Sequence, residues 1–304
     1  MTDVVQPLGD TPARPVHHVD APLSPPSAST GLFEVFRRRY LLRLLVRREI
    51  SARYQGSLLG LLWSYVNPLT QFFIYYFVMG VLFQLHQDVP NFAIHMFCGI
   101  ILVHFFNETF NAGTRSIVRN KTLVQKMAVP REMFPVASML VSAYHMLPQF
   151  VILTAVCVIT GWTPELAGVV ALVLALAIIM TLGTAMALLF SAANVFFRDV
   201  SNVASIMTNL VRFGVPMIYP YSLVAERFHG HTEFYLANPI AEAVLLVQRA
   251  FWVGSTDDPQ ATIAAHLPDH LFTRSIIGLG ICLVVLGVGQ LVFSRLENKI
   301  PERL

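Results

Sequence analysis

The chain has 304 residues, of which 55% are hydrophobic and only 13% are charged, and its mean hydropathy is +0.60. A soluble domain carries about 25% charged residues, so this composition excludes an ordinary soluble protein and indicates a membrane protein with several spans. The net charge is only +3 and the arginine clusters flank apolar segments, which argues against nucleic-acid binding.

The first two segments of the chain are predicted to lie outside the membrane core. Residues 1–30 contain six prolines and almost no large apolar residues, which predicts a disordered tail rather than a signal peptide. Residues 31–55 are predicted to form an interfacial helix that turns at Gly56 and Gly60 into the first span, because long arginine side chains can reach water from such a helix. Its apolar stripe recurs at helical spacing and comprises Phe33, Phe36, Tyr40 and Leu44.

Six segments are apolar and long enough to cross a bilayer, which takes about 20 residues. They are residues 62–85, 92–111, 136–160, 166–192, 199–220 and 275–294. The stretches 31–61, 112–135, 193–198 and 295–304 carry 16 Lys and Arg residues, whereas the alternate stretches carry three. This asymmetry places both termini in the cytoplasm and predicts an all-α membrane protein with six transmembrane helices.

The outer loop, residues 221–274, is predicted to contain a helix from Asn238 to Trp252 that is too short to span. Its apolar face is formed by Ile240, Val244, Val247 and Phe251, and we expect the helix to lie at the outer surface or to dip into it. The pair Asp257 and Asp258 could bind the metal of a membrane glycosyltransferase, but the neighbouring glycine and proline favour a polar turn.

The cytoplasmic segment 112–135 combines basic residues with a modest apolar face at helical spacing. That face comprises Ile117, Val118, Val124 and Met127. The positive-inside rule explains the charges by itself, but an exposed apolar strip on a loop helix favours a docking surface for another protein.

Polar residues inside the spans form two candidate functional features. The fifth span carries a polar stripe, Asn202, Ser205, Asn209, Arg212 and Pro216, which favours a pathway-lining face over helix–helix hydrogen bonds. His104 and Glu108 lie one helical turn apart in the second span, where a structural hydrogen bond is favoured over a proton relay. His95 and His145 receive the same structural interpretation.

Several chemistries are not indicated by the sequence. A P-loop needs a lysine directly after a glycine, and none of Lys121, Lys126 and Lys299 follows one. No zinc-protease or serine-hydrolase motif occurs, and the three cysteines lie in apolar segments. We therefore expect no catalytic residue, no metal site and no cofactor in this chain.

Five motifs in a fixed order resemble the polysaccharide-exporting ABC-2-type permeases, the membrane subunits of O-antigen, teichoic-acid and capsule exporters. The strongest is Arg53-Tyr-Gln-Gly-Ser-Leu-Leu-Gly-Leu-Leu-Trp-Ser-Tyr-Val-Asn-Pro68. The others are Asn120-Lys-Thr-Leu-Val, Pro130-Arg-Glu-Met-Phe-Pro135, Phe196-Phe-Arg-Asp-Val200 and Tyr235-Leu-Ala-Asn-Pro239.

The resemblance implies a homodimer of this permease in the plasma membrane with two ATP-binding subunits, which would bind ATP and magnesium, and a polyprenyl-diphosphate-linked glycan as cargo. The lipid diphosphate would enter beside Arg47, Arg48, Arg53, Tyr54, Gln55, Gly56, Ser57 and Gly60. The glycan path would involve Trp63, Tyr65, Asn67, Phe72, Tyr76, Asn209, Arg212 and Tyr219. A coupling helix over 114–129 would meet the ATPase through Arg115, Arg119, Asn120, Lys121, Val124 and Lys126, and short outer helices would form gates.

Arginine outnumbers lysine 18 to 3, which fits a GC-rich genome, and the chain looks most like an actinobacterial member. The expected cargo is then a galactan of a mycobacterial-type wall. Two other functions are consistent with parts of the sequence. A secondary transporter would use Glu108 for ion coupling, and a membrane glycosyltransferase would use Asp257 and Asp258.

Overall fold

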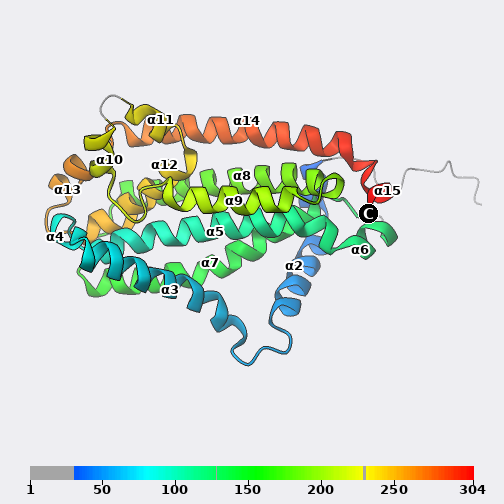
Figure 1. Cartoon of the computed structure of the whole chain (residues 1–304), viewed down its shortest axis with the longest axis horizontal. Coiled ribbons are helices and arrows are strands. Elements are labelled where there is room, and N and C mark those ends of the chain that lie inside the picture. Colours follow the sequence, from blue (N-terminus) through cyan, green and yellow to red (C-terminus); the bar gives the residue numbers. More distant parts are fainter. Residues whose placement is uncertain (1–30, 128, 229–230) are drawn as a thin grey trace, which may run out of the picture.

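The computed structural model describes residues 31–127, 129–228 and 231–304, and the predicted tail of residues 1–30 lies outside them. Every regular element in the described part is a helix, so the predicted all-α class is confirmed. Four long helices run side by side along the longest axis of the molecule (Figure 1). They are α5 (Phe92–Arg119), α7 (Met133–Ile159), α8 (Leu166–Phe196) and α14 (Leu271–Glu297).

These four helices are long and apolar enough to cross a membrane, and they correspond to four of the six predicted spans. Each contains 27 to 31 residues. At about 1.5 Å per residue, such a helix is roughly 40 Å long and exceeds the hydrocarbon core of about 30 Å. The chain is therefore an integral membrane protein.

The other two predicted spans, 62–85 and 199–220, are built from shorter helices. The first consists of η1 (Gly60–Leu62), α3 (Trp63–Tyr75) and η2 (Tyr76–Leu82), a π-helical continuation of α3. The second is shorter than predicted, because α9 (Val200–Phe213) ends before Gly214 and its 14 residues extend only about 21 Å. Pro216 follows in a non-helical segment, so it does not belong to the helical polar stripe predicted for this span.

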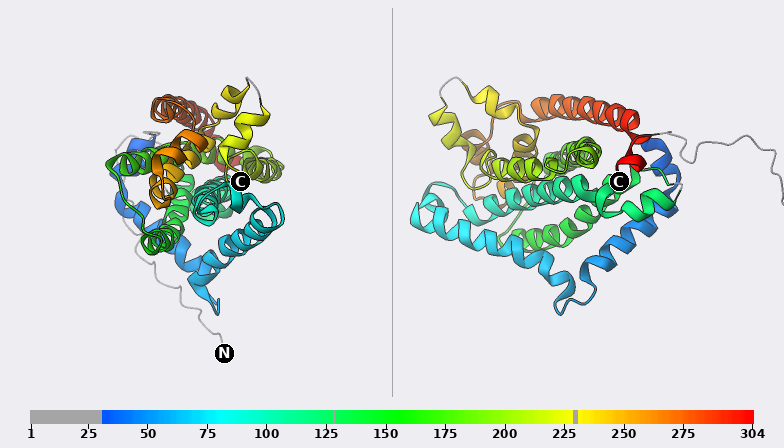
Figure 2. Two further views of the ribbon diagram at one scale, coloured as in Figure 1. Left: turned by 90° about the vertical axis from the view of Figure 1, so that its left-hand side faces the viewer. Right: turned by 45° about the vertical axis from the view of Figure 1, so that its right-hand side comes forward.

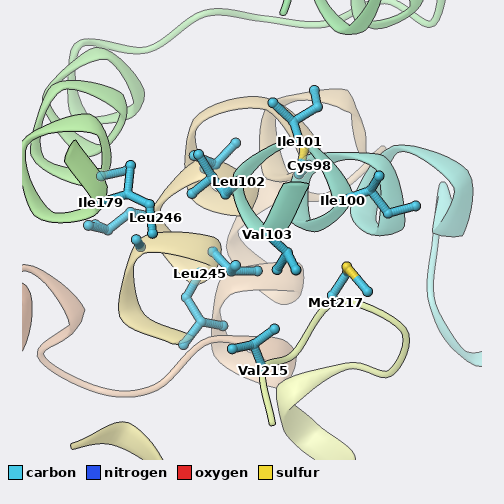
Figure 3. Close-up of a cluster of buried hydrophobic side chains, with 14 of the residues drawn as sticks. Cys98, Ile100, Ile101, Leu102, Val103, Ile179, Val215, Met217, Leu245 and Leu246 are labelled. Carbon is cyan, nitrogen blue, oxygen red and sulfur yellow. The ribbon is translucent and has the colours of Figure 1, made fainter. Parts of the chain in front are cut away.

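Helix α5 forms the centre of the bundle. Within its most apolar window 83% of residues are buried, against 33% or fewer in the other three long helices. Helices α7, α8, α9 and α12 (Pro239–Val247) pack on it. Figure 3 shows part of this core, where Cys98 and Leu102 of α5 lie in one cluster with Ile179 of α8 and Leu246 of α12. Most of α5 therefore faces the interior of the protein rather than lipid, which explains why this span can be less apolar than the others.

One end of the bundle, here called the arginine-rich end, holds both ends of the described chain (Figures 1 and 2). It contains α1 (Leu32–Arg37), α2 (Arg39–Tyr54), α6 (Lys121–Lys126) and α15 (Ile300–Arg303). An apolar cluster joins these elements to α7 and α14 and includes Val35, Leu42, Val124, Phe134, Phe293 and Ile300. Residue 31, where the described chain begins, therefore lies at the same end of the bundle as the C-terminal helix α15.

The predicted interfacial helix over 31–55 is divided into α1 and α2 at Arg38. The chain then forms an elbow, residues 55–59, which projects from the side of the bundle before α3 begins (Figures 1 and 2). Gly56 and Gly60 have φ angles of 76° and 50°, in the left-handed region that favours glycine. The predicted turn at these two glycines is confirmed.

The predicted coupling helix over 114–129 is not a separate helix. Helix α5 continues to Arg119, and only the short α6 follows. Two residues of the predicted exposed apolar face, Ile117 and Val124, are buried in the cluster at the arginine-rich end, whereas Val118 and Met127 are exposed. The sequence pattern could not separate these pairs because the chain changes direction at Asn120, between the two helices.

The opposite end of the bundle carries α4 (Leu85–Asp88), α10 (Tyr221–Arg227), α11 (Thr232–Leu236) and α13 (Pro259–His266) (Figure 1). Between α11 and α13, α12 enters the bundle and continues as η3 (Gln248–Trp252) and η4 (Val253–Ser255). Asn238 caps α12 by accepting a hydrogen bond of 3.0 Å from the backbone N–H of Ile240.

The helix predicted from Asn238 to Trp252 is confirmed, but its single apolar face is not. All residues from Ile240 to Val247 are buried, because α12 packs against α5, α8 and α14 on different sides. Of the two predicted positions, the helix adopts the one that dips inward. Glu242 is the one carboxyl in α12, and burial raises its pKa to about 7 although Arg274 acts in the opposite direction.

Candidate functional site

A polar cavity of about 970 Å³ lies between α2, α3, α5, α7 and α9 at the inner side of the elbow. Its walls combine charged side chains with amides and hydroxyls from spans that are otherwise apolar. The uncharged polar residues include Asn67, Gln71, Asn107, Asn111, Ser138 and Ser142. Such a cavity can hold a hydrated or anionic group at the depth of the spans.

The cavity carries an excess of positive charge. Five arginines line it against two glutamates, which leaves a formal charge of +3 with histidine neutral. The arginines are Arg48, Arg53, Arg115, Arg119 and Arg212, and the glutamates are Glu49 and Glu108. Arginine binds carboxylates and phosphates through paired, charge-assisted hydrogen bonds, so the cavity is suited to an anion.

The last turn of α2 is joined to α5 and α7 by one polar cluster. Arg53 Nη1 forms an ion pair with Glu108 Oε1 and lies 3.2 Å from Nδ1 of the buried His145. The Tyr54 hydroxyl lies 2.7 Å from Nε2 of the same histidine and 2.5 Å from Oγ of Ser64. These contacts fix the end of α2 against the bundle.

A second polar cluster joins the middle of α2 to the end of α5. Glu49 forms an ion pair with Arg119 and accepts a hydrogen bond of 3.1 Å from Nδ2 of Asn120. Oδ1 of Asn120 accepts a bond of 3.0 Å from Arg48. Asn120 therefore bridges two neighbouring residues of α2 from its buried position before α6.

The residues predicted for diphosphate binding divide into two groups. Arg48 and Arg53 line the cavity, and Tyr54 lies beside it in the cluster with His145. Arg47 is exposed but does not line the cavity, and the elbow residues point to the outside of the molecule. The elbow residues concerned are Gln55, Gly56 and Ser57, with Gly60 donating its N–H to Ser57 Oγ at 3.1 Å.

The predicted glycan-path residues of the first span also occupy different environments. Asn67 lines the cavity, Trp63 is exposed, and the hydroxyl of Tyr65 is buried without a hydrogen-bond partner among the described residues. Phe72 and Tyr76 pack toward α5, with ring-centroid distances of 5.5 Å to Phe97 and 6.4 Å to Phe92 respectively.

The polar stripe of α9 divides between the cavity and the surface. Arg212 lines the cavity, whereas Asn202 and Asn209 are exposed. Ser205 lies 3.3 Å from the side chain of Asn111 on α5, so this part of the stripe makes helix–helix hydrogen bonds. The hydroxyl of Tyr219 donates to the carbonyl of Phe213 at 2.7 Å and closes the end of α9.

The predicted ATPase-coupling residues lie at the arginine-rich end but not on one surface. Arg115 and Arg119 face the cavity, and Asn120 and Val124 are buried. Lys121 and Lys126 of α6 are exposed.

His145 was interpreted from the sequence as a structural histidine and was not predicted to belong to this site. A polar pattern in α7 could have revealed it, because Ser138, Ser142, His145 and Gln149 recur at helical spacing in an otherwise apolar span. All four are buried, and two of them line the cavity. Such a stripe is the usual signature of a span that faces a polar interior.

Two alternative functions lose support from the geometry. Asp258 accepts hydrogen bonds from the backbone N–H groups of Gln260 and Ala261, so it caps α13 in a polar turn. Glu108, the proposed ion-coupling carboxylate, is paired with Arg53. Within the described residues no group of three or more His, Cys, Asp or Glu side chains could hold a metal ion.

Comparison with known proteins identifies the family. Residues 40–251 match the family described as ABC-2 type transporter, and the chain belongs to it. The chain is 26% identical over 266 residues to an O-antigen export system permease protein RfbA of Klebsiella pneumoniae, covering 87% of this chain and 95% of that protein. It is 27% identical over 231 residues to the protein of the same name from Myxococcus xanthus, covering 76% and 87% respectively.

Proposed function

We propose that this chain is the membrane subunit of an ATP-driven exporter that moves a polyprenyl-diphosphate-linked polysaccharide across the plasma membrane to its outer face. Family membership supports a transporter subunit, and the relatives named as O-antigen export permeases support a polysaccharide cargo. The galactan cargo and the actinobacterial origin stay predictions from the sequence.

The observation that carries the proposal is the arginine-lined cavity behind the elbow. A lipid diphosphate needs a site where its anionic group meets cations while its hydrocarbon chain stays in lipid. The cavity provides the cations, with Arg48 and Arg53 on α2, a helix whose exposed residues include Tyr40 and Leu44. Bidentate arginine contacts would hold the diphosphate without requiring a metal ligand from this chain.

The proposal includes partners that this chain needs for its function. Two copies of the permease would assemble with two ATP-binding subunits, and ATP and magnesium would be bound by those subunits. The excess of basic residues around α2 and α6 supports a cytoplasmic position for the arginine-rich end. The exposed Lys121 and Lys126 of α6 would then be available to the ATP-binding subunit.

The experiment is ATP hydrolysis by the permease co-purified with its ATP-binding subunit and reconstituted in lipid nanodiscs. A lipid-diphosphate-linked glycan should stimulate turnover, and Arg53→Gln should reduce that stimulation while basal turnover stays near the wild-type rate. Glutamine is preferred to glutamate because a second acid would face Glu108 directly. Arg249→Gln is the matched control, since Arg249 pairs with Glu165 at 2.7 Å and lies outside the cavity.

Two results would contradict the proposal. One is a fully functional exporter purified without any ATP-binding subunit. The other is glycan export that continues after ATP depletion but stops with an uncoupler, which would favour the secondary transporter.

A further inference from the structure

The arginine-lined cavity already contains an anion, and that anion is a side chain of the protein. Glu108 projects from α5 with only 10% of its side chain exposed, and it forms an ion pair with Arg53. Its carboxylate also lies 3.4 Å from Nδ1 of His145 and 3.7 Å from Nε2 of His104. The carboxylate is thus placed by two neighbouring spans, α5 and α7.

The two partners of this ion pair differ in their freedom to move. The Arg53 side chain is 45% exposed, so it can turn toward another anion without disturbing the core. Glu108 belongs to the most buried helix of the bundle and keeps its histidine neighbours. An incoming anion would therefore remove Arg53 from Glu108, rather than move Glu108.

The ion pair also crosses the cavity. Helix α2 packs on α7, and its polar side chains reach α5 through Arg53–Glu108 and through Glu49 with Arg119. A ligand that draws the Arg53 guanidinium away from α5 breaks the first of these bridges. A diphosphate is a stronger competitor than a second carboxylate, because it carries more negative charge and more acceptor oxygens.

We propose that Glu108 is the counter-ion that holds Arg53 in the unloaded transporter, and that the diphosphate of the substrate displaces it. This inference rests on the proposed function, and it makes Glu108 a residue that sets the threshold for substrate binding. When Arg53 leaves, the end of α2 keeps the contacts of Tyr54 with His145 on α7 and Ser64 on α3, but it loses its ion pair with α5.

The test is equilibrium binding of radiolabelled farnesyl diphosphate to the permease–ATPase complex in nanodiscs. Glu108→Gln keeps the side-chain shape but removes both the competing charge and its repulsion of the ligand. A partly exposed ion pair corresponds to about a fivefold change in affinity, so the Kd should fall about fivefold. Glu108→Asp keeps the charge but shortens the reach to Arg53, so its Kd should lie between those of Glu108→Gln and wild type.

Glu233→Gln is the matched control. Glu233 pairs with Arg274 through contacts of 2.5 and 2.8 Å at the opposite end of the bundle. The same loss of a carboxylate beside an arginine should leave the Kd for farnesyl diphosphate unchanged there. An equal fall in Kd for this control would show a general charge effect and overturn the role of Glu108.

The outcomes separate this inference from the proposed function. If Arg53→Gln weakens binding but Glu108→Gln binds with the wild-type Kd or more weakly, the counter-ion role is refuted and the exporter proposal stands. If the wild-type complex shows no saturable binding of farnesyl diphosphate, both proposals fail. Should Glu108→Gln not yield a monodisperse complex, a Kd for Glu108→Asp equal to or above that of wild type refutes the role by itself.

Discussion

The close contact between Gly99 of α5 and Met217 gives the sharpest prediction about the core. A Cβ atom at Gly99 would lie 2.7 Å from Cγ, 2.8 Å from Cβ and 2.9 Å from Cα of Met217, and real Cβ contacts essentially never come below 3.0 Å. Methionine is flexible, so its Cγ could move away. The Cβ and Cα atoms move only with the backbone, so Gly99→Ala has to displace the segment after α9.

The cost of this displacement follows from the overpacking of other cores, where an added methyl group costs about 1–3 kcal/mol. Gly280→Ala is the matched control, because Gly280 lies inside α14 and nothing is within 4 Å of its added Cβ. Both substitutions replace glycine by alanine inside a helix and gain the same helix propensity. The difference between their stabilities therefore reports the steric cost at Gly99. At about 2–4 °C per kcal/mol, Gly99→Ala should unfold roughly 2–12 °C below Gly280→Ala.

The assay is the apparent Tm of detergent-solubilised protein, followed by loss of the monodisperse peak in size-exclusion chromatography at one fixed heating time. In a Met217→Ala background, Gly99→Ala should still lower the Tm, although by less than in the wild type, because the Cα atom of residue 217 stays in place. Equal Tm values for Gly99→Ala and Gly280→Ala would refute the close approach. No loss of Tm from Gly99→Ala in the Met217→Ala background would show that the side chain, not the backbone, limits the space.

Two further predictions concern the opposite end of the bundle. Burial raises the pKa of Glu242 from 4.5 to about 7, so its contribution to stability is present below pH 4.5 and is lost as the pH rises to 7. The apparent Tm of the wild type should therefore fall between pH 5 and pH 8. Glu242→Gln should remove the part of this fall that comes from ionisation of Glu242. A variant with the same Tm–pH profile as the wild type would contradict the raised pKa of Glu242. Asp258→Ala should lower the free energy of unfolding by about 1 kcal/mol, because it removes the cap of α13, while glycan export continues. Asp257→Ala should change neither the stability nor the export. Loss of polymer synthesis in both Asp variants would instead support the glycosyltransferase.

The sequence predicted the parts of the fold that depend on local chemistry. Continuous apolar residues identified α7, α8 and α14, because a span must be apolar wherever it meets lipid. The turn at the two glycines of the elbow and the start of a helix at Asn238 were also predicted, since each answers a local backbone requirement. The motif order identified the family from residues that lie far apart in the chain.

Features that depend on tertiary packing were predicted less well. Ile117 and Val124 looked like an exposed strip, yet both are buried because α1, α2 and α15 cover them. Helix α12 was predicted to be amphipathic, but it is enclosed by other helices on several sides. Such a helix has no solvent-exposed face, so its sequence need not alternate between apolar and polar faces. Within the candidate site, Arg53 was predicted from its motif, whereas His145 received only a structural interpretation, since its partners on α2 and α5 are distant in the sequence.

Asn120 connects the predicted ATPase-coupling residues with the predicted diphosphate-binding residues. It precedes α6, the segment expected near the ATP-binding subunit, and its side chain also binds Arg48 and Glu49 of α2. If docking of that subunit alters the affinity for the lipid diphosphate through this residue, thermodynamic reciprocity requires the lipid to alter docking by the same factor. The effect of the ATP-binding subunit on cargo affinity and the effect of cargo on subunit affinity would then be one coupling free energy, transmitted by Asn120.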